Sequence, residues 1–155
     1  MDTQTSELLG RNRLIDELLL AGLEVVVPLR DRGIDLIAYV DLAAVASKFV
    51  AVPVQMKAAS TRAFSVDAKY ERISNLVLAY VWGLQAPEHA QTFALTYPEA
   101  LKVAGSLGWT NTNSWAQGSY STSTPSKQLC ELLEPFKMSP SAWRRKVSGV
   151  SGIAL

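Results

Sequence analysis

Residues 1–58 contain a helix pattern followed by three strand patterns, and this order limits the folds open to the chain. Leu8, Ile15 and Leu18 recur at helical spacing between charged residues, which predicts an amphipathic helix over 5–21. Runs rich in β-branched residues follow at 23–28, 34–40 and 48–58. The polar turn 29–33 ends on Gly33, so we expect the first two strands to form a hairpin.

The rest of the chain alternates strand and helix patterns. The run 74–84 is compatible with a strand or a buried helix, and its β-branched and aromatic content favours a strand. The remaining predictions are a loop or short helical turn at 41–47, a polar connector at 60–65, a strand at 92–97, a helix at 98–108, a long ordered loop or hairpin at 109–127, a helix at 126–136, a short basic helix or turn at 139–147, and frayed last residues. Together these predict an α/β fold with a mixed central sheet of about five strands flanked by helices.

Length and composition limit the number of domains and the kinds of metal or disulfide site that the chain can contain. A chain of 155 residues with 48% hydrophobic and 19% charged residues is typical of one globular domain, which we divide into a core at 1–97 and a C-terminal extension at 98–155. The single cysteine, Cys130, excludes an intrachain disulfide and a multi-cysteine zinc site, and its apolar helix position predicts a core role. The single histidine, His89, excludes a multi-histidine metal site.

Neither a membrane nor a secretory route is expected. No apolar run approaches the length of about 20 residues that a membrane span needs. The first ten residues are acidic and polar, unlike a signal peptide, so we expect a cytoplasmic location. The net charge of +1 gives no overall attraction to nucleic acid, although 137–155 carry four basic residues and no acid.

Three polar residues form the arrangement best suited to chemistry. Asp35 opens the second strand directly after the turn glycine, and Gln55 and Lys57 leave the same face of the third strand because they are two residues apart. Phosphodiester hydrolysis needs an oxygen-ligated divalent cation, an activated water and a cation beside the transition state. These three side chains supply such groups, whereas the structural alternative is a turn-capping aspartate beside a solvated strand face.

The segments GIDLIAY at 33–39 and VPVQMKAAS at 52–60, after a helix that ends near AGLEVVVP at 21–28, resemble the PD-(D/E)XK nuclease superfamily. The likeness covers residues 5–97 and is to restriction-endonuclease-like and Holliday-junction-resolvase-like members with a Q-x-K motif. It implies Asp35, Gln55 and the backbone carbonyl of Met56 as ligands of Mg²⁺ or Mn²⁺, and Lys57 as the residue that positions water and phosphate. It also implies DNA as the substrate and makes a homodimer one expectation.

The chain departs from that family in two places. Many members add a glutamate from the first helix, for which Glu7 and Glu17 are the candidates, although neither has the expected spacing. An amide at position 55 keeps an acceptor oxygen but removes a negative charge, which lowers metal affinity. The alternatives are therefore an active endonuclease and an inactive nuclease-fold module that binds nucleic acid or a protein. An α/β domain with an unrelated small-molecule pocket is a third.

Basic and aromatic residues outside this arrangement also have two interpretations. Five basic residues near the site are candidates for contacts with DNA phosphates, or for surface ion pairs with Asp31, Asp67 and Glu71. These five are Arg30, Arg32, Arg62, Lys69 and Arg72. The aromatics Trp109, Trp115, Tyr120 and Trp143, near Arg144, Arg145 and Lys146, either stack on unpaired bases or pack the extension onto the sheet.

Overall fold

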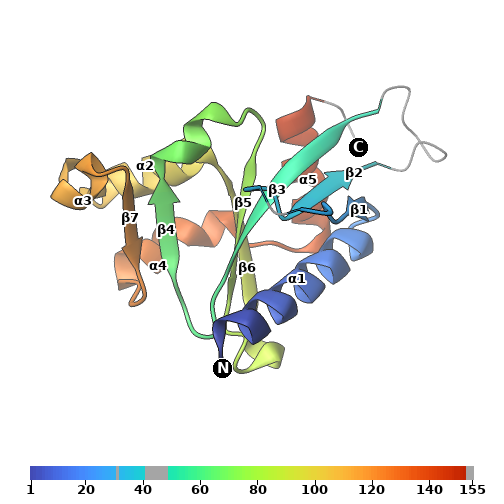
Figure 1. The fold of residues 1–155 in the computed structure, drawn as a ribbon, viewed down its shortest axis with the longest axis horizontal. Coiled ribbons are helices and arrows are strands. Elements are labelled where there is room, and N and C mark those ends of the chain that lie inside the picture. The colour runs from blue at the N-terminus through green and yellow to red at the C-terminus, as the bar shows by residue number, and fades with distance from the viewer. Residues whose placement is uncertain (31, 41–48, 153–155) are drawn as a thin grey trace.

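The computed structural model describes residues 1–30, 32–40 and 49–152. It is built on a five-stranded mixed sheet with the strand order β1-β2-β3-β5-β6, which confirms the predicted α/β class (Figure 1). Its strands are β1 (Glu24–Val26), β2 (Leu36–Tyr39), β3 (Ala51–Ala58), β5 (Val77–Trp82) and β6 (Gln91–Thr96). None of the helices in these described ranges has the length and apolar character to cross a membrane.

The sheet is antiparallel except at its centre. β1 pairs with β2, β2 with β3 and β5 with β6 in antiparallel register, while β3 and β5 run parallel. The predicted hairpin is therefore confirmed, and so is the strand interpretation of 74–84. Pro53 lies opposite Ile37 of β2, and the pairing with β5 begins only at Val54, so the proline avoids the part of β3 that has strands on both sides.

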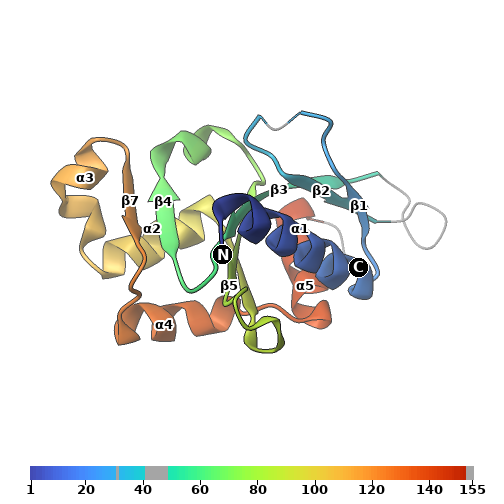
Figure 2. The ribbon, with the colours of Figure 1, turned by 60° about the horizontal axis from the view of Figure 1, so that its bottom comes forward.

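The connection between the parallel strands carries a small second sheet. β4 (Phe64–Asp67) and the 3-10 helix η1 (Ala68–Arg72) lie between β3 and β5 in the chain, and β4 pairs with the distant β7 (Ser119–Thr122). Figures 1 and 2 both show β4 and β7 at one end of the molecule, with β1 and β2 at the other. The connector predicted at 60–65 is thus wrong from Phe64 onward, because β4 takes a partner more than fifty residues away.

Two helices cover one face of the central sheet. The helix α1 (Thr3–Leu20) packs Leu14 and Leu18 against a cluster that includes Val54 and Met56 of β3. The helix α5 (Pro140–Ser151) adds Trp143 to the same cluster, with its side chain fully buried. The helix α5 is longer than the short helix predicted at 139–147. It continues to Ser151, where frayed residues were expected.

The other face is covered by the second sheet and two helices. Its cluster joins Leu78 and Tyr80 of β5 to Phe64 and Val66 of β4, and to residues of α2 (Tyr97–Ser106) and α4 (Lys127–Leu133). The segment predicted as a loop or hairpin at 109–127 instead holds η3 (Trp109–Asn111), the short helix α3 (Asn113–Ala116) and β7. The remaining 3-10 turns are η2 (Pro87–His89) and η4 (Glu134–Phe136).

Local capping explains the helix limits. Asp2 accepts a hydrogen bond from the backbone N–H of Thr5 at the start of α1, and Gly22 just beyond its end adopts a φ of +74°. Thr96 and Glu99 form a reciprocal capping box at the start of α2. The Ser126 and Ser139 side chains cap α4 and α5. The segment predicted at 41–47 lies outside the described residues.

Candidate functional site

Asp35 lies where the β2–β3 ladder stops. Leu36 pairs with Val54, so the same register places Asp35 opposite Gln55. The Asp35 carboxylate Oδ2 accepts a hydrogen bond from the backbone N–H of Met56 at 2.6 Å, and its own N–H donates to the Val54 carbonyl at 3.0 Å. Asp35 is only 7% exposed. The side chain therefore satisfies a buried backbone donor of β3 beyond the last paired residue of β2.

The Gln55 amide bridges the two other groups of the predicted site. Its Nε2 donates to Asp35 Oδ2 at 2.5 Å and to the Met56 carbonyl at 3.2 Å. Its Oε1 is buried and has no hydrogen-bond partner among the described residues. Gly33, with a φ of +91°, passes over this oxygen, since a Cβ at that position would lie 3.9 Å from it. The structure thus brings together Asp35, Gln55 and Met56.

These three residues fit an oxygen-ligated cation. The Gln55 Nε2 atom donates to both Asp35 Oδ2 and the Met56 carbonyl oxygen, so both oxygens point toward the position of this nitrogen. A half-turn of the terminal Gln55 torsion exchanges nitrogen for oxygen, and the two are indistinguishable in shape. The exchanged arrangement would gather three oxygens, which Mg²⁺ or Mn²⁺ accepts as ligands and which repel one another without a cation.

Lys57 leaves the same face of β3 as Gln55 and reaches η1. Its Nζ lies 5.2 Å from the centroid of the Tyr70 ring, and Lys69 Nζ lies 5.0 Å from the same centroid. Tyr70 is 4% exposed, so its ring is a fixed surface for both ammonium groups. Although burial alone raises the pKa of Asp67, hydrogen bonds from Lys69 and the positive charges of Lys69 and Lys57 lower it below the ordinary aspartate value.

The two candidate glutamates of α1 have partners elsewhere. Glu17 accepts hydrogen bonds from Thr92 at 2.8 Å and from the Trp143 indole at 3.1 Å, and it pairs with Arg13. Glu7 pairs with Arg11 at 3.0 Å on the helix surface. Over residues 1–30, 32–40 and 49–152, no three His, Cys, Asp or Glu side chains form a group that could hold a metal ion. In the same ranges, Asp35 is the only carboxylate with a hydrogen bond to Gln55 or to Met56.

The five basic candidates for DNA contacts are all exposed. Lys69 forms an ion pair with Asp67 at 2.9 Å, as expected from the interpretation of these residues as partners in surface ion pairs. Within the described part of the chain, Arg30, Arg32, Arg62 and Arg72 form no salt bridge, and the alternative pairing with Asp31 involves a residue outside that part.

Of the C-terminal aromatics, Trp143 is buried, whereas Trp109, Trp115 and Tyr120 are half-buried. Trp109 stacks on Tyr120 with a centroid distance of 4.2 Å, and Trp143 is fully buried against α1. Trp115 is half-buried against the second core cluster. These contacts are the ones expected if the aromatics pack the extension onto the sheet.

Sequence reasoning missed two residues of the site. Tyr70 reaches Lys57 only through the fold of the crossover connection, and nothing in the sequence around it indicates that contact. Gly33 was recognised as a turn residue, but its place over the free Gln55 oxygen depends on the hairpin register. Compared with protein-family models, curated proteins and solved structures, the chain matches none.

Proposed function

We propose that the protein hydrolyses DNA phosphodiester bonds at a divalent-cation site formed by Asp35, Gln55 and the Met56 carbonyl. The observation that carries the proposal is the Gln55 amide, which touches both other groups while its own oxygen has no hydrogen-bond partner in the part of the chain that the structure describes. The resemblance of GIDLIAY and VPVQMKAAS to PD-(D/E)XK nucleases supports the same assignment.

The roles of the chain's own residues follow from their chemistry. A divalent cation held there would offset charge on the phosphate and favour ionisation of water. Asp35 would contribute the full negative charge, and Gln55 and Met56 would contribute neutral oxygens. Lys57 would provide a positive charge next to the reacting phosphate. Its contact with the buried Tyr70 ring restricts where the ammonium can lie, because that ring is fixed in the core.

Cleavage of plasmid and branched DNA with Mg²⁺ or Mn²⁺ tests the proposal. Replacing Lys57 by alanine should abolish metal-dependent cleavage, since it removes the cation beside the phosphate and leaves the Asp35–Gln55 contact intact. Lys102→Ala is the matched control, because Lys102 is exposed on α2 and is not one of the predicted site residues. Cleavage that persists in Lys57→Ala, or that needs no divalent cation, would contradict the mechanism.

A catalytically inactive module that binds nucleic acid or a protein is the second candidate. It is favoured by the single carboxylate at the site and by the absence of a third acidic or histidine ligand among the described residues. This candidate predicts DNA binding, measured by fluorescence anisotropy, with no cleavage under any divalent metal. Failure of both binding and cleavage would leave neither candidate standing.

Two further parts of the proposal concern the assembly and the location of the protein. Cutting both strands of a duplex would need two copies of the site, so we infer a homodimer on DNA, which sedimentation of the protein with and without a DNA duplex would detect. A cytoplasmic location is inferred along with it, and cell fractionation tests that location.

A further inference from the structure

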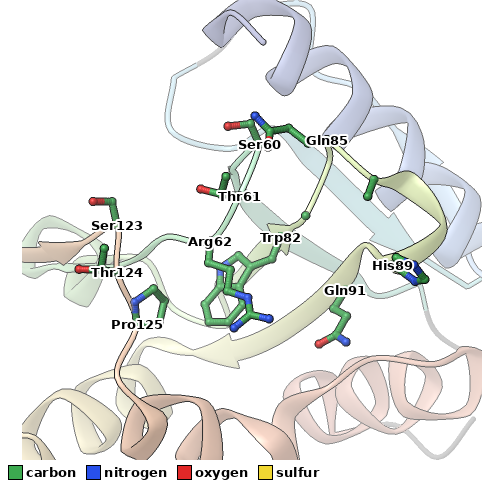
Figure 3. Close-up of a pocket in the computed structure, with 12 residues that line it drawn as sticks. Ser60, Thr61, Arg62, Trp82, Gln85, His89, Gln91, Ser123, Thr124 and Pro125 are labelled. Atoms are coloured by element: carbon green, nitrogen blue, oxygen red, sulfur yellow. The ribbon is translucent and has the colours of Figure 1, made fainter.

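A second cavity lies away from the Asp35–Gln55 site. It measures about 460 Å³ and is formed by residues 60–62 after β3, residues from Trp82 to Gln91 around the β5–β6 turn, and residues 123–125 before α4 (Figure 3). Asp35, Gln55 and Lys57 do not line it. Its volume is within the range of pockets that hold small organic ligands, about 300–1,000 Å³.

Hydrogen bonds fix the backbone segments that form the walls of this cavity. The N–H of Gly83 donates to the Thr61 carbonyl at 2.6 Å, and the N–H of Gln85 donates to the Ser60 carbonyl at 3.0 Å. The Trp82 indole donates to the Ala63 carbonyl at 2.6 Å. From α1, Arg13 donates to the carbonyls of Pro87 and Ala90. The backbone around the cavity is thus fixed before any ligand arrives, which lowers the entropic cost of binding.

The lining is rich in hydrogen-bond donors, and none of the described residues that form it carries a carboxylate. Arg62 supplies a guanidinium that has no acidic partner among the described residues, and His89 supplies an imidazole. Glu88, beside His89 in the chain, is exposed and does not line the cavity. Hydroxyl and amide groups complete the polar lining, from Ser60, Thr61, Ser123, Thr124, Gln85 and Gln91.

We propose that this cavity binds a phosphate monoester of about nucleotide size, with Arg62 on the phosphate. A guanidinium matches phosphate oxygens with two parallel N–H donors, and surrounding hydroxyls donate to the remaining oxygens. The glutamine amides can both donate to and accept from a polar ring edge, while Trp82 and Pro125 form an apolar wall for the organic part. Such a group occurs on a free nucleotide and at the phosphorylated end of a nucleic-acid strand.

Calorimetric titration in EDTA tests this site independently of the metal site. The probes are inorganic phosphate, ribose 5-phosphate, AMP, adenosine, and a dinucleotide with and without a 5′-phosphate. We expect AMP to bind and adenosine not to bind. Arg62→Ala should weaken AMP at least about tenfold, because it removes a charge-assisted contact. Arg72→Ala, an exposed arginine that does not line the cavity, should leave the affinity unchanged.

The sources of the phosphate are separated by the probes. Tighter binding of the phosphorylated dinucleotide than of AMP assigns the cavity to strand ends, and the reverse assigns it to free nucleotides. Because Arg62 is exposed, Arg62→Ala should unfold at the same temperature as the parent protein. Absence of AMP binding at about 10 mM, equal binding of adenosine, or equal loss in Arg62→Ala and Arg72→Ala would overturn the proposal.

Discussion

Gly10 of α1 and Ala58 of β3 approach so closely that a Cβ on the glycine would lie 2.6 Å from the Cβ of the alanine. The Met56 sulfur would be 3.2 Å from the same added atom. Alanine at position 10 therefore forces α1 away from the sheet. We expect Gly10→Ala to lower the free energy of unfolding by about 1–3 kcal/mol, measured by urea denaturation, despite the better helix propensity of alanine.

Gly149→Ala is the matched control for that substitution. Gly149 lies inside α5, and an added Cβ there meets nothing within 4 Å. The change should raise the free energy of unfolding by about 0.5–1 kcal/mol, since alanine loses less backbone entropy in a helix. If Gly10→Ala stabilises the protein as Gly149→Ala does, the close crossing of α1 and β3 is wrong.

Gln55→Glu should make folding depend on divalent cations. The new carboxylate would lie where the Gln55 amide now contacts Asp35 Oδ2 at 2.5 Å, and the hydrogen bond from Gln55 to the Met56 carbonyl would be lost. Without a cation we expect a loss of about 2–4 kcal/mol, seen as a lower unfolding temperature at neutral pH. Mg²⁺ should restore much of that loss, because it binds the native pair of carboxylates.

An exposed glutamine provides the comparison for this metal response. Gln117→Glu, at the exposed C-cap of α3, adds the same charge with no acidic residue within four positions of it in the chain, so Mg²⁺ should not shift its unfolding temperature. Equal Mg²⁺ responses in the two variants would mean that the Asp35–Gln55 pair does not form a cation site.

The Glu99–Lys146 ion pair should make stability depend on acidic pH. Burial alone raises the pKa of Glu99, but hydrogen bonds from Lys146 at 2.7 Å and from the Thr96 N–H lower it below the ordinary value of 4.5. A lowered folded pKa means that this stabilisation is present above about pH 4.5 and is lost as the pH falls through the folded pKa. Glu99→Gln should remove this part of the acid dependence, with a cost of about 0.5–1 kcal/mol at pH 7 in thermal unfolding.

Trp143→Phe should show how much the hydrogen bond from Trp143 of α5 to Glu17 of α1 contributes to the free energy of unfolding. The substitution removes the indole N–H that Glu17 accepts at 3.1 Å and leaves a small gap in a fully buried position. We expect a loss of about 1–3 kcal/mol in chemical denaturation. Trp115→Phe, at a half-buried indole, should cost clearly less, and a similar cost for both would assign Glu17 no such role.

Helices and strands whose residue pattern lies within their own segment could be predicted from the sequence. The runs that became β2, β3, β5 and β6 carry β-branched or aromatic residues, and α1 and α2 carry their own caps. β4 and β7 were missed because each is a four-residue strand, and their pairing joins Phe64 to Thr122, more than fifty residues away in the chain. A four-residue segment contains too few positions for an alternation of apolar and polar residues to be recognised.

The candidate site was predictable to the extent that it is local in the chain. Asp35 and Gln55 meet because a hairpin register sets them opposite each other, and the spacing of Gln55 and Lys57 fixes their common face. The Tyr70 contact and the partners of Glu17 depend on how η1, β6 and α5 pack, which no local pattern specifies.

The short chain separation between Asp35 and Gln55 also affects the order of folding. Twenty residues join them through neighbouring antiparallel strands, whereas the parallel partner of β3 arrives only after the long crossover that carries β4 and η1. Closing the shorter loop costs less chain entropy, so the polar contact should be among the earliest tertiary contacts to form. Mutations that slow the pairing of β5 with β3 would then delay formation of the hydrophobic cores, whereas the Asp35–Gln55 contact would already have formed.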